Sequence, residues 1–311
     1  MDEFELIDAV VAALGAATRG PGIVVGPGDD CSVAVLPPDT ELVSSIDTLV
    51  CGVHFPADAA GEWVGHRALG VSVSDLAAMG AAPLHAIMSV TLEADRQPWL
   101  LDFARGMGDA ARKMGIAVVG GNIARGPLNI AISVLGFVPR GQALLRSGAR
   151  PGDRIFVSGS VGGAGLALDR LDSVPTMAAL QRAGRDDPYV RYCLPAPRLV
   201  LGISLRGIAS AAIDVSDGLL ADLGHVCAAS GVGAHVLGER VPIARGATLS
   251  AAIHAGDDYE LLFTVPSARL GALEELAADV VDIGEITAAP GVRVTCGDSD
   301  LVVPSAGYRH F

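Results

Sequence analysis

Residues 68–92 read ALGVSVSDLAAMGAAPLHAIMSVTL, and the spacing of the apolar residues changes within this stretch. Up to Met79 the apolar residues recur at helical spacing, which predicts a helix that begins near Glu62 and ends before Pro83. After Pro83 every second residue is apolar, which is the period of a strand, and we expect one over 84–92. A helix followed at once by a strand predicts an α/β fold.

The rest of the first half continues this alternation of helices and strands. We expect helices over 4–14 and 98–114, and strands over 42–47, 116–119 and 128–138. In the first helix the apolar residues at helical spacing are Phe4, Ile7, Val11 and Leu14, and we expect this stripe to pack on the core. The pattern as a whole predicts an α/β first half whose sheet contains some antiparallel pairing.

The apolar periodicity lapses over 140–152, where glycine, arginine and proline gather, and it resumes at Arg154. Such a lapse is typical of a domain boundary. We therefore expect one domain over 1–147 and a second over 148–311, again with alternating helices and strands. The short VSD motifs at 73–75 and 215–217 leave an internal duplication open.

Composition excludes several classes of protein. The chain has 311 residues, half of them hydrophobic, and a formal net charge of −13, which would repel nucleic acid. The apolar stretches are too short for a membrane span, and the start lacks the basic region of a signal peptide, so we expect a cytoplasmic protein. Five scattered cysteines without a C-x-x-C pair favour reduced thiols, most of them in the core.

Five short acidic segments interrupt apolar stretches, and we interpret them as turns. They are GPGDD at 26–30, SIDT at 45–48, VSD at 73–75, DVSDG at 214–218 and GDDYE at 256–260. Buried carboxylates need a partner or a cation, and the chain has a single lysine, Lys113. Asp also caps helices and tightens turns, so no single segment is decisive. Taken together, the segments favour Mg²⁺ held against phosphate.

The common phosphate-binding and hydrolase motifs are absent. No G-x-x-x-x-G-K-[ST] sequence and no protein-kinase signature set is present. Ser158 lies outside a G-x-S-x-G context, which argues against a catalytic triad. The glycine-rich segment 159–165 follows a strand and could cradle phosphate, but a plain tight turn is an equal interpretation.

Seven motifs together resemble the thiamine-monophosphate kinase family. They are GDDCSV at 28–33, DTLVCGVHF at 47–55, ALGVSVSDLAAMGAAP at 68–83, GGNIARGPL at 120–128, IDVSDGLLADLGH at 213–225, GDDYELLF at 256–263 and the final GYRHF. The resemblance runs nearly from end to end. It implies a two-domain PurM-like ATP-binding fold, α/β (α+β), with an N-terminal mixed sheet covered by helices and a C-terminal α/β domain.

The resemblance also implies an activity. This family transfers the γ-phosphoryl group of ATP to thiamine monophosphate, giving thiamine diphosphate, and works as a homodimer with several Mg²⁺ ions. One phosphate must approach another, and magnesium would neutralise their charge during in-line transfer. Because the attacking oxygen is already an anion, no protein side chain is expected to act as a general base.

The family's binding residues carry over by position. For metal they are Asp30, Ser45, Ile46, Asp47, Asp75, Asn122, Asp214 and Asp217. For ATP they are Gly121, Asn122, Arg146 and Ser216, and for the thiamine substrate His54, Asp257 and Tyr308. Without the resemblance, His54 reads equally well as a strand histidine, Arg146 as a solvated linker charge and Tyr308 as a core residue.

Two positions depart from the family pattern. Asn122 stands where the family commonly has a metal-binding aspartate, and Ile46 stands where it commonly has a threonine. We hypothesise that both changes weaken one magnesium site that also includes Asp47.

Two alternatives stay open at this point. The chain could be a degenerate binder of nucleotide or thiamine phosphate, or a sister ATP-dependent synthetase, of which aminoimidazole ribonucleotide synthetase is the nearest. Selenophosphate synthetase and the hydrogenase-maturation protein HypE fit less well, because no reactive cysteine precedes Cys31 and the chain ends in Phe311. The Asp- and Arg-rich stretch 171–192 remains unassigned as a lid.

Overall fold

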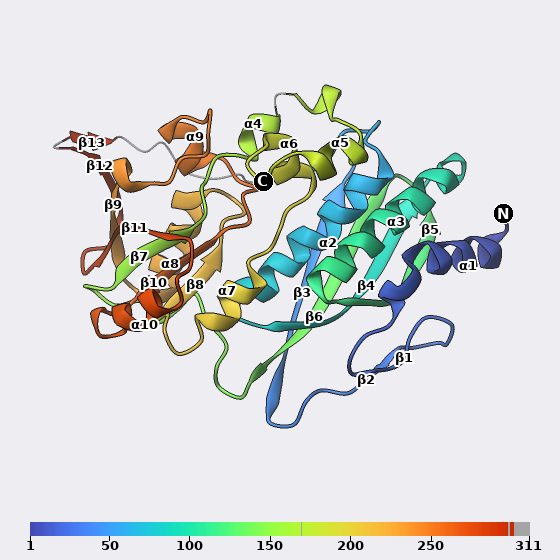
Figure 1. The fold of residues 1–311 in the computed structure, drawn as a ribbon, viewed down its shortest axis with the longest axis horizontal. Coiled ribbons are helices and arrows are strands. Elements are labelled where there is room, and N and C mark those ends of the chain that lie inside the picture. The colour runs from blue at the N-terminus through green and yellow to red at the C-terminus, as the bar shows by residue number, and fades with distance from the viewer. Residues whose placement is uncertain (169, 298, 302–311) are drawn as a thin grey trace.

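The computed structural model describes residues 1–168, 170–297 and 299–301 and shows two main sheets, one in each half of the chain (Figure 1). The N-terminal half holds a four-stranded sheet, the C-terminal half a seven-stranded sheet, and β1 (Ile23–Val25) pairs with β2 (Val33–Ala34) in a small separate ribbon. No helix within the described ranges is both long and apolar enough to cross a bilayer.

The N-terminal sheet has the order β3-β6-β4-β5. Its strands are β3 (Thr40–Val50), β4 (Ala82–Leu92), β5 (Ala117–Arg125) and β6 (Asn129–Pro139). The strand β6 pairs antiparallel with β3 and β4, whereas β4 and β5 run parallel, so the sheet is mixed as expected. The expected strand over 116–119 was too short, because β5 continues through the two glycines of GGN to Arg125.

Two long helices cover one face of this sheet (Figure 1). They are α2 (Gly61–Ala78) and α3 (Gln97–Met114), and α2 is buried along almost its whole length. Glycines allow the two helices to approach closely: a Cβ built on Gly106 would lie 1.7 Å from the carbonyl oxygen of Glu62, and one built on Gly65 would lie 2.1 Å from that of Phe103. The close helix crossing therefore depends on residues without side chains.

The first helix, α1 (Glu3–Leu14), packs on α3, but by a different face from the expected one. Leu6, Val10 and Leu14 are buried, whereas Phe4 is 77% exposed and Ile7 is 38% exposed. The helix carries two apolar stripes, and its periodicity cannot say which one faces the protein. A capping box, in which the Asp2 side chain accepts from the Glu5 backbone N–H, fixes where the helix begins.

The C-terminal sheet has the order β13-β12-β9-β11-β7-β10-β8. Its strands are β7 (Arg154–Ser158), β8 (Ala211–Asp214), β9 (Gly233–Leu237), β10 (Leu261–Val265), β11 (Val280–Thr287), β12 (Gly291–Cys296) and β13 (Ser299–Leu301). Its pairs are antiparallel except for β9 with β12. The sheet forms a second hydrophobic core with α8 (Leu219–Ser230), which contains Leu219, Leu223 and Val226.

The remaining helices are short. They are α4 (Gly165–Leu168), α5 (Met177–Arg182), α6 (Pro188–Cys193), α7 (Leu199–Ser204), α9 (Leu249–His254) and α10 (Leu270–Glu275). Single 3-10 turns occur at Gly15–Thr18, Ala94–Arg96, Leu171–Ser173, Gly238–Arg240 and Ser267–Arg269. Residues 140–153 connect the two sheets, and the domain boundary between 147 and 148 stays a prediction.

Two sequence expectations are wrong at this level. The segment 45–48 lies inside β3 and the segment 73–75 lies inside α2, so only three of the five acidic segments are turns. In these segments Asp75 accepts a hydrogen bond from Ser45, whereas Oδ2 of Asp47 has no hydrogen-bond partner among the described residues. The cysteines are not mostly in the core: Cys193 and Cys227 are buried, whereas Cys31 and Cys296 are exposed.

The close crossing of α2 and α3 makes a stability prediction. Gly106→Ala should destabilise the protein by about 2 kcal/mol or more, because the added methyl group meets backbone rather than a movable side chain. Chemical denaturation of the purified variant measures this change.

Gly224→Ala is the matched control, because Gly224 lies in α8 with nothing within 4 Å of an added Cβ. Its higher helix propensity should leave stability unchanged or raise it by up to about 1 kcal/mol. Equal effects of the two substitutions would show that the close crossing is not as rigid as the structure indicates.

Candidate functional site

The contact between α2 and β8 joins acidic residues from both halves of the chain. The Ser74 hydroxyl, on α2, donates to Oδ2 of Asp214 at the end of β8, at 2.6 Å. On the same helix, Asp75 accepts a hydrogen bond from the hydroxyl of Ser45 on β3. Residues separated by as many as 140 positions are thus held together by direct hydrogen bonds.

Three of these residues line a small cavity of about 220 Å³. Ser45, Asp75 and Asp214 contribute its oxygen atoms, and Arg146, from the connection between the sheets, lines the same cavity. The charge of Arg146 lowers the pKa of Asp75, although burial raises it more strongly. The structure therefore brings together four of the residues expected from the sequence.

The acidic side chains around this cavity are poorly neutralised. Burial, followed by repulsion from Asp75, raises the pKa of Asp47 to about 6, and Oδ2 of Asp47 is buried without a hydrogen-bond partner. Burial and the same repulsion raise the pKa of Asp214 to about 7. Three carboxylates with one nearby arginine form a hard, oxygen-only donor set that fits a divalent cation such as Mg²⁺.

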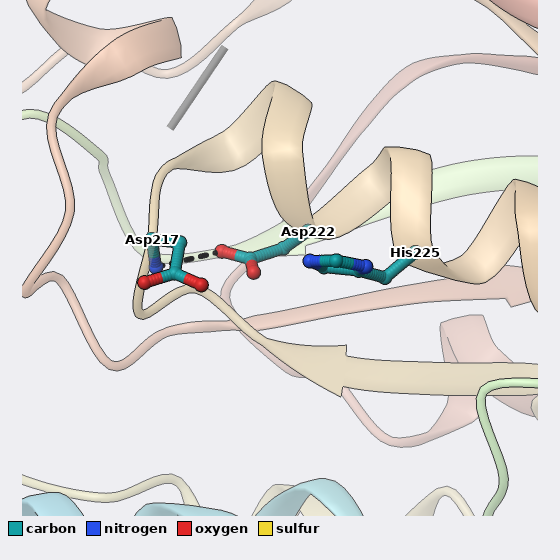
Figure 2. A group of neighbouring side chains, drawn as sticks. All are labelled: Asp217, Asp222 and His225. Carbon is teal, nitrogen blue, oxygen red and sulfur yellow. Dashed lines mark hydrogen bonds between the residues drawn. The ribbon is translucent and has the colours of Figure 1, made fainter. Parts of the chain in front are cut away.

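A second acidic group lies beside the first and includes a residue that sequence reasoning missed. Figure 2 shows Asp217, Asp222 and His225, which each offer a ligand atom within 4.8 Å of the others. One oxygen of Asp222 accepts from the backbone N–H groups of Ser216, Asp217 and Gly218 at 3.1–3.2 Å. Burial, followed by repulsion from Asp214 and Asp217, raises the pKa of Asp222 to about 7. Its second oxygen is available to a cation.

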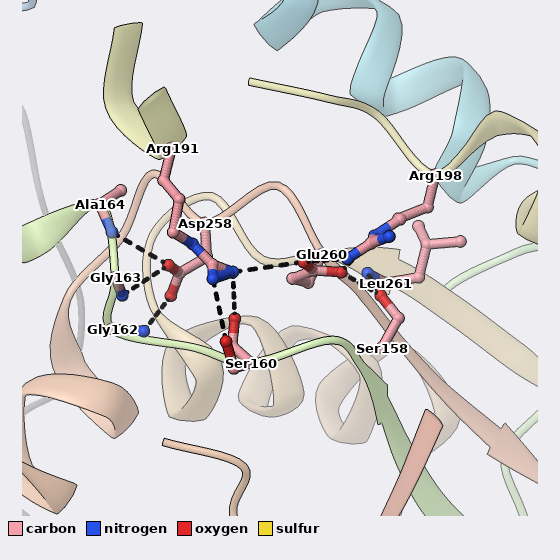
Figure 3. Close-up of polar contacts among 10 residues, drawn as sticks. All are labelled: Ser158, Ser160, Gly162, Gly163, Ala164, Arg191, Arg198, Asp258, Glu260 and Leu261. Carbon is pink, nitrogen blue, oxygen red and sulfur yellow. Dashed lines mark hydrogen bonds and ion pairs between the residues drawn. The ribbon is translucent and has the colours of Figure 1, made fainter. Parts of the chain in front are cut away.

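The glycine-rich loop at 159–165 holds a carboxylate of the protein itself (Figure 3). The N–H groups of Gly162, Gly163 and Ala164 donate to Asp258, in the GDDYE segment. A phosphate would have to displace this buried side chain to use the same donors. The loop is therefore a structural turn, and the alternative of a phosphate cradle is not supported.

Glu260, in the same segment, is also fully engaged (Figure 3). Arg198 makes a bidentate pair with it at 2.6 and 2.5 Å, Arg191 contacts it at 3.3 Å, and the Ser158 hydroxyl donates to it. Arg191 belongs to the 171–192 stretch that sequence reasoning left unassigned, and Arg198 follows that stretch by six residues. These contacts tie that region to the C-terminal sheet.

Asp257 is the remaining carboxylate of GDDYE, and it faces α2. Arg67 donates to its Oδ1 at 2.6 Å, and the Tyr259 hydroxyl donates to the same oxygen at 2.9 Å. Arg67 is 2% exposed and stacks on the ring of Tyr192, 3.9 Å from its centroid. The second carboxylate oxygen of Asp257 accepts no hydrogen bond from the described residues, and its side chain is 24% exposed.

His54 belongs to the same network. Its Nδ1 accepts the Val50 N–H at 3.0 Å, and its carbonyl oxygen accepts the Tyr192 hydroxyl at 2.7 Å. Tyr192 thus connects His54 with Arg67, and through Arg67 with Asp257. Two of the three residues expected to bind the thiamine substrate are joined by contacts, while the third, Tyr308, lies outside the described residues.

Four expected residues do not join the acidic cluster, namely Asp30, Gly121, Asn122 and, as described below, Ile46. Asp30 lies exposed in the turn between β1 and β2, and Gly121 and Asn122 lie exposed on β5. A Cβ on Gly121 would meet the Met88 carbonyl oxygen at 2.4 Å, so packing alone explains that glycine.

The hypothesis that Asn122, Ile46 and Asp47 share one metal is not supported within a single chain. Asp47 lies on the edge strand β3 and Asn122 on the opposite edge strand β5, three strand spacings or about 14 Å apart. Strand register also places them on opposite faces, because Asp47 pairs with the buried Ile132 whereas Asn122 pairs with the exposed Ser89. Ile46 is 65% exposed and points away from Ser45 and Asp47.

Several residues of these networks were not expected from the sequence. They are Ser74, Arg67, Tyr192, Asp222, Asp258 and Glu260. Four of them lie within motifs that carried the family resemblance, and that position was the available signal. Arg67 and Tyr192 lie outside those motifs, and only the fold shows that they meet.

Comparison with known proteins gives the same architecture and names relatives. Family models described as AIR synthase related protein match here, the N-terminal domain over residues 28–138 and the C-terminal domain over 150–297. Thiamine-monophosphate kinase of Salmonella typhimurium strain LT2 is 37% identical over 305 residues, covering 93% of this chain and 92% of that protein.

Solved structures of similar proteins have the same architecture. The crystal structure of thiamine-monophosphate kinase from Stenotrophomonas maltophilia K279a has a TM-score of 0.82 and 37% identity, covering 94% of this chain and 96% of the other. A structure described as AaThiL complexed with AMPPCP and TMP has a TM-score of 0.75 and 29% identity, covering 99% and 97% of the two chains.

The repulsion within the acidic cluster makes a prediction about stability. In the absence of divalent cations at about pH 8, Asp47→Asn should raise the free energy of unfolding by about 1–3 kcal/mol, because it removes a buried, unpartnered charge. A carboxyl whose pKa is raised on folding favours the folded state when protonated. The advantage of the variant should therefore shrink as the pH falls through 6. Urea denaturation in EDTA measures both effects.

Asp8→Asn, on the exposed surface of α1, is the control and should change stability little at either pH. Adding millimolar MgCl₂ should stabilise the wild type more than Asp47→Asn, since the variant loses one candidate ligand. A wild-type protein that is more stable than Asp47→Asn in EDTA would contradict the account of the cluster.

Proposed function

The chain belongs to the thiamine-monophosphate kinase family, and we propose that it transfers the γ-phosphoryl group of ATP to the phosphate of thiamine monophosphate in a Mg²⁺-dependent reaction. The products are thiamine diphosphate and ADP. The observation that carries this proposal is the cavity that Ser45, Asp75 and Asp214 line together with Arg146. A cluster that repels itself in this way requires cations, and cations are what two reacting phosphates require as well.

Magnesium fits the residues at the site. We assign Asp47, Asp75 and Asp214 to one metal-binding region, and Asp217 with Asp222 to an adjacent one. Bound Mg²⁺ would neutralise the charge of the phosphate groups. The Ser45 and Ser74 hydroxyls hold the carboxylates in place before the metal arrives. Asp30 and Asn122 remain proposed ligands without support from contacts within this chain.

For ATP, Arg146 is the cation best placed to meet a phosphate, because it lines the acidic cavity and makes no ion pair among the described residues. Ser216 lies next to the second acidic group, where its N–H is already held by Asp222. The description of AaThiL as complexed with AMPPCP and TMP supports a site for both substrates in this fold.

For thiamine monophosphate, Asp257 and His54 are the proposed contacts. Arg67 and Tyr259 both bind Oδ1 of Asp257, which fixes the carboxylate and leaves Oδ2 for the substrate. An oriented carboxylate suits a cationic ring that carries an amino group. Tyr192 holds the backbone of His54 against this network, so Arg67, Tyr192 and Tyr259 are positioning residues.

No protein side chain needs to take a proton in this reaction. The attacking phosphate oxygen of the acceptor is already an anion, so the residues need only orient the two phosphates in line and exclude water. Arg146 would stabilise the charge that develops on the transferred group. This account agrees with a site in which the acidic residues serve as ligands.

We further propose a cytoplasmic homodimer. The face of the four-stranded sheet opposite α2 and α3 exposes Leu42, Ile46 and Ile87, which are 53%, 65% and 39% exposed. A second copy of the chain packed on this face would cover them. Dimerisation could also bring Asn122, which shares this face, toward a neighbouring site.

A direct assay tests the proposal. The purified protein, with ATP, MgCl₂ and thiamine monophosphate, should form thiamine diphosphate, and free thiamine should give none. The two remaining alternatives are a sister synthetase and a degenerate binder, and the names of the relatives favour the kinase over both. ATP binding without any product would overturn the kinase in favour of those alternatives.

The role of the Asp257 network gives a further prediction. Tyr259→Phe removes one hydrogen bond to Oδ1 of Asp257 and leaves the Arg67 ion pair intact. It should raise the KM for thiamine monophosphate by roughly 3–10-fold, the cost of one hydrogen bond, with the KM for ATP nearly unchanged. Steady-state kinetics with each substrate varied in turn provide the measurement.

Tyr189→Phe is a matched control, since that hydroxyl contacts only Ser173 and the Arg170 carbonyl oxygen. It should alter neither constant. An equal rise in both KM values for Tyr259→Phe would indicate a general loss of structure and would argue against a substrate-specific role for Asp257.

A further inference from the structure

A second cavity, of about 870 Å³, shares no lining residue with the acidic cavity. It lies between His66 of α2 and the end of α3, and most of its other lining residues come from α5, α6, the segment 194–198 and α7. Its volume is in the range of pockets that bind small molecules.

The walls of this cavity are mainly apolar. They include Met114, Leu180, Leu194, Pro195, Pro197 and Leu201. No aspartate or glutamate lines it, although the chain as a whole has 35 of them against 22 lysines and arginines. The cavity therefore differs in charge from the acidic site and from most of the molecule.

One buried polar side chain faces this cavity without a partner. His66, on α2, is 4% exposed, and its Nδ1 makes no hydrogen bond. Burial, followed by the nearby charge of Lys113, lowers the pKa of His66 to about 4, so the ring is neutral at neutral pH. Buried polar atoms without partners are uncommon in folded proteins, because the lost hydration is not replaced.

Three cationic side chains line the same cavity, and two of them, Lys113 and Arg185, are the ones that matter here. Lys113 is the only lysine of the chain, and Arg185 follows α5. Neither makes an ion pair with a carboxylate among the described residues, whereas Arg198, which also lines the cavity, is paired with Glu260. Lys113, on α3, and the unpartnered His66, on α2, line this same cavity.

We propose that this cavity binds a small amphipathic anion. Its apolar body lies against the leucine and proline walls, its anionic group pairs with Lys113, and the His66 imidazole completes its hydrogen bonds. Arg185 adds attraction for the same charge. The ligand is distinct from ATP and thiamine monophosphate, whose proposed contacts lie elsewhere, so this inference does not depend on the proposed function.

Anilinonaphthalene sulfonate, a fluorescent amphipathic anion, is a suitable probe for the purified full-length protein. It should bind with saturation at one site, and Lys113→Met should weaken the binding at least fivefold, because the methionine keeps the volume but not the charge. Arg112→Met is the matched control, since Arg112 comes directly before Lys113 on α3, does not line the cavity and is paired with Asp109. It should leave the affinity unchanged.

A second set of measurements keeps the proposal falsifiable. His66→Phe should also weaken the binding of the probe. Octanoate should displace the probe better than octanol, which has the same chain length but no charge. Thermal melts of each variant show that the fold is retained, and Arg185→Met serves as the second charge variant if Lys113→Met melts early. Equal affinity for Lys113→Met and Arg112→Met, or displacement of the probe by saturating ATP with MgCl₂, would overturn the proposal.

Discussion

The burial of like charges at the contact between α2 and β8 is the constraint on which this structure depends. Burial, followed by repulsion from Asp75, raises the pKa of Asp47 and of Asp214, burial raises that of Asp75, and Arg146 is the arginine that lines the acidic cavity. A protein stabilised only by its own contacts would gain from replacing these carboxylates with neutral residues. Their presence is explained if the folded chain is completed by a cation, and the same cation is what a reaction between two phosphates requires.

The GDDYE segment shows how the rest of the C-terminal half supports that site. Asp258 holds the glycine-rich loop, and Glu260 holds Arg191 and Arg198, so both acidic side chains are satisfied within the protein. Of the three, Asp257 alone has an oxygen that accepts no hydrogen bond from the described residues, and its position is fixed by Arg67 and Tyr259. These three neighbouring acidic residues thus have different roles. All three carry a carboxylate, so the difference arises from the groups that each one contacts.

Much of the fold could be predicted from hydrophobic period, because α2, α3, β4 and β6 bury the residues whose spacing indicated them. The buried face of α1 could not be predicted in this way, since the helix has two apolar stripes and hydrophobic period alone does not say which of them packs on α3. At the site, the residue types predicted oxygen ligands for a cation. The pairing of Asp75 with Ser45, and the separation of Asn122 from Asp47, depend on strand order and register, which local sequence does not determine.

The helix α2 links the features of the molecule that bear on function. Over ten residues it presents His66 to the apolar cavity, Arg67 to Asp257, and Ser74 and Asp75 to the acidic cluster. Its burial and its glycine contacts with α3 leave it little freedom to move one of these side chains without the others. His66 is the residue before Arg67, and Arg67 positions Asp257. An anion bound beside His66 would therefore contact the same rigid helix that positions Asp257. The apolar cavity and the acidic cavity differ in composition and charge. Both contact α2, and this shared helix is a physical connection between them.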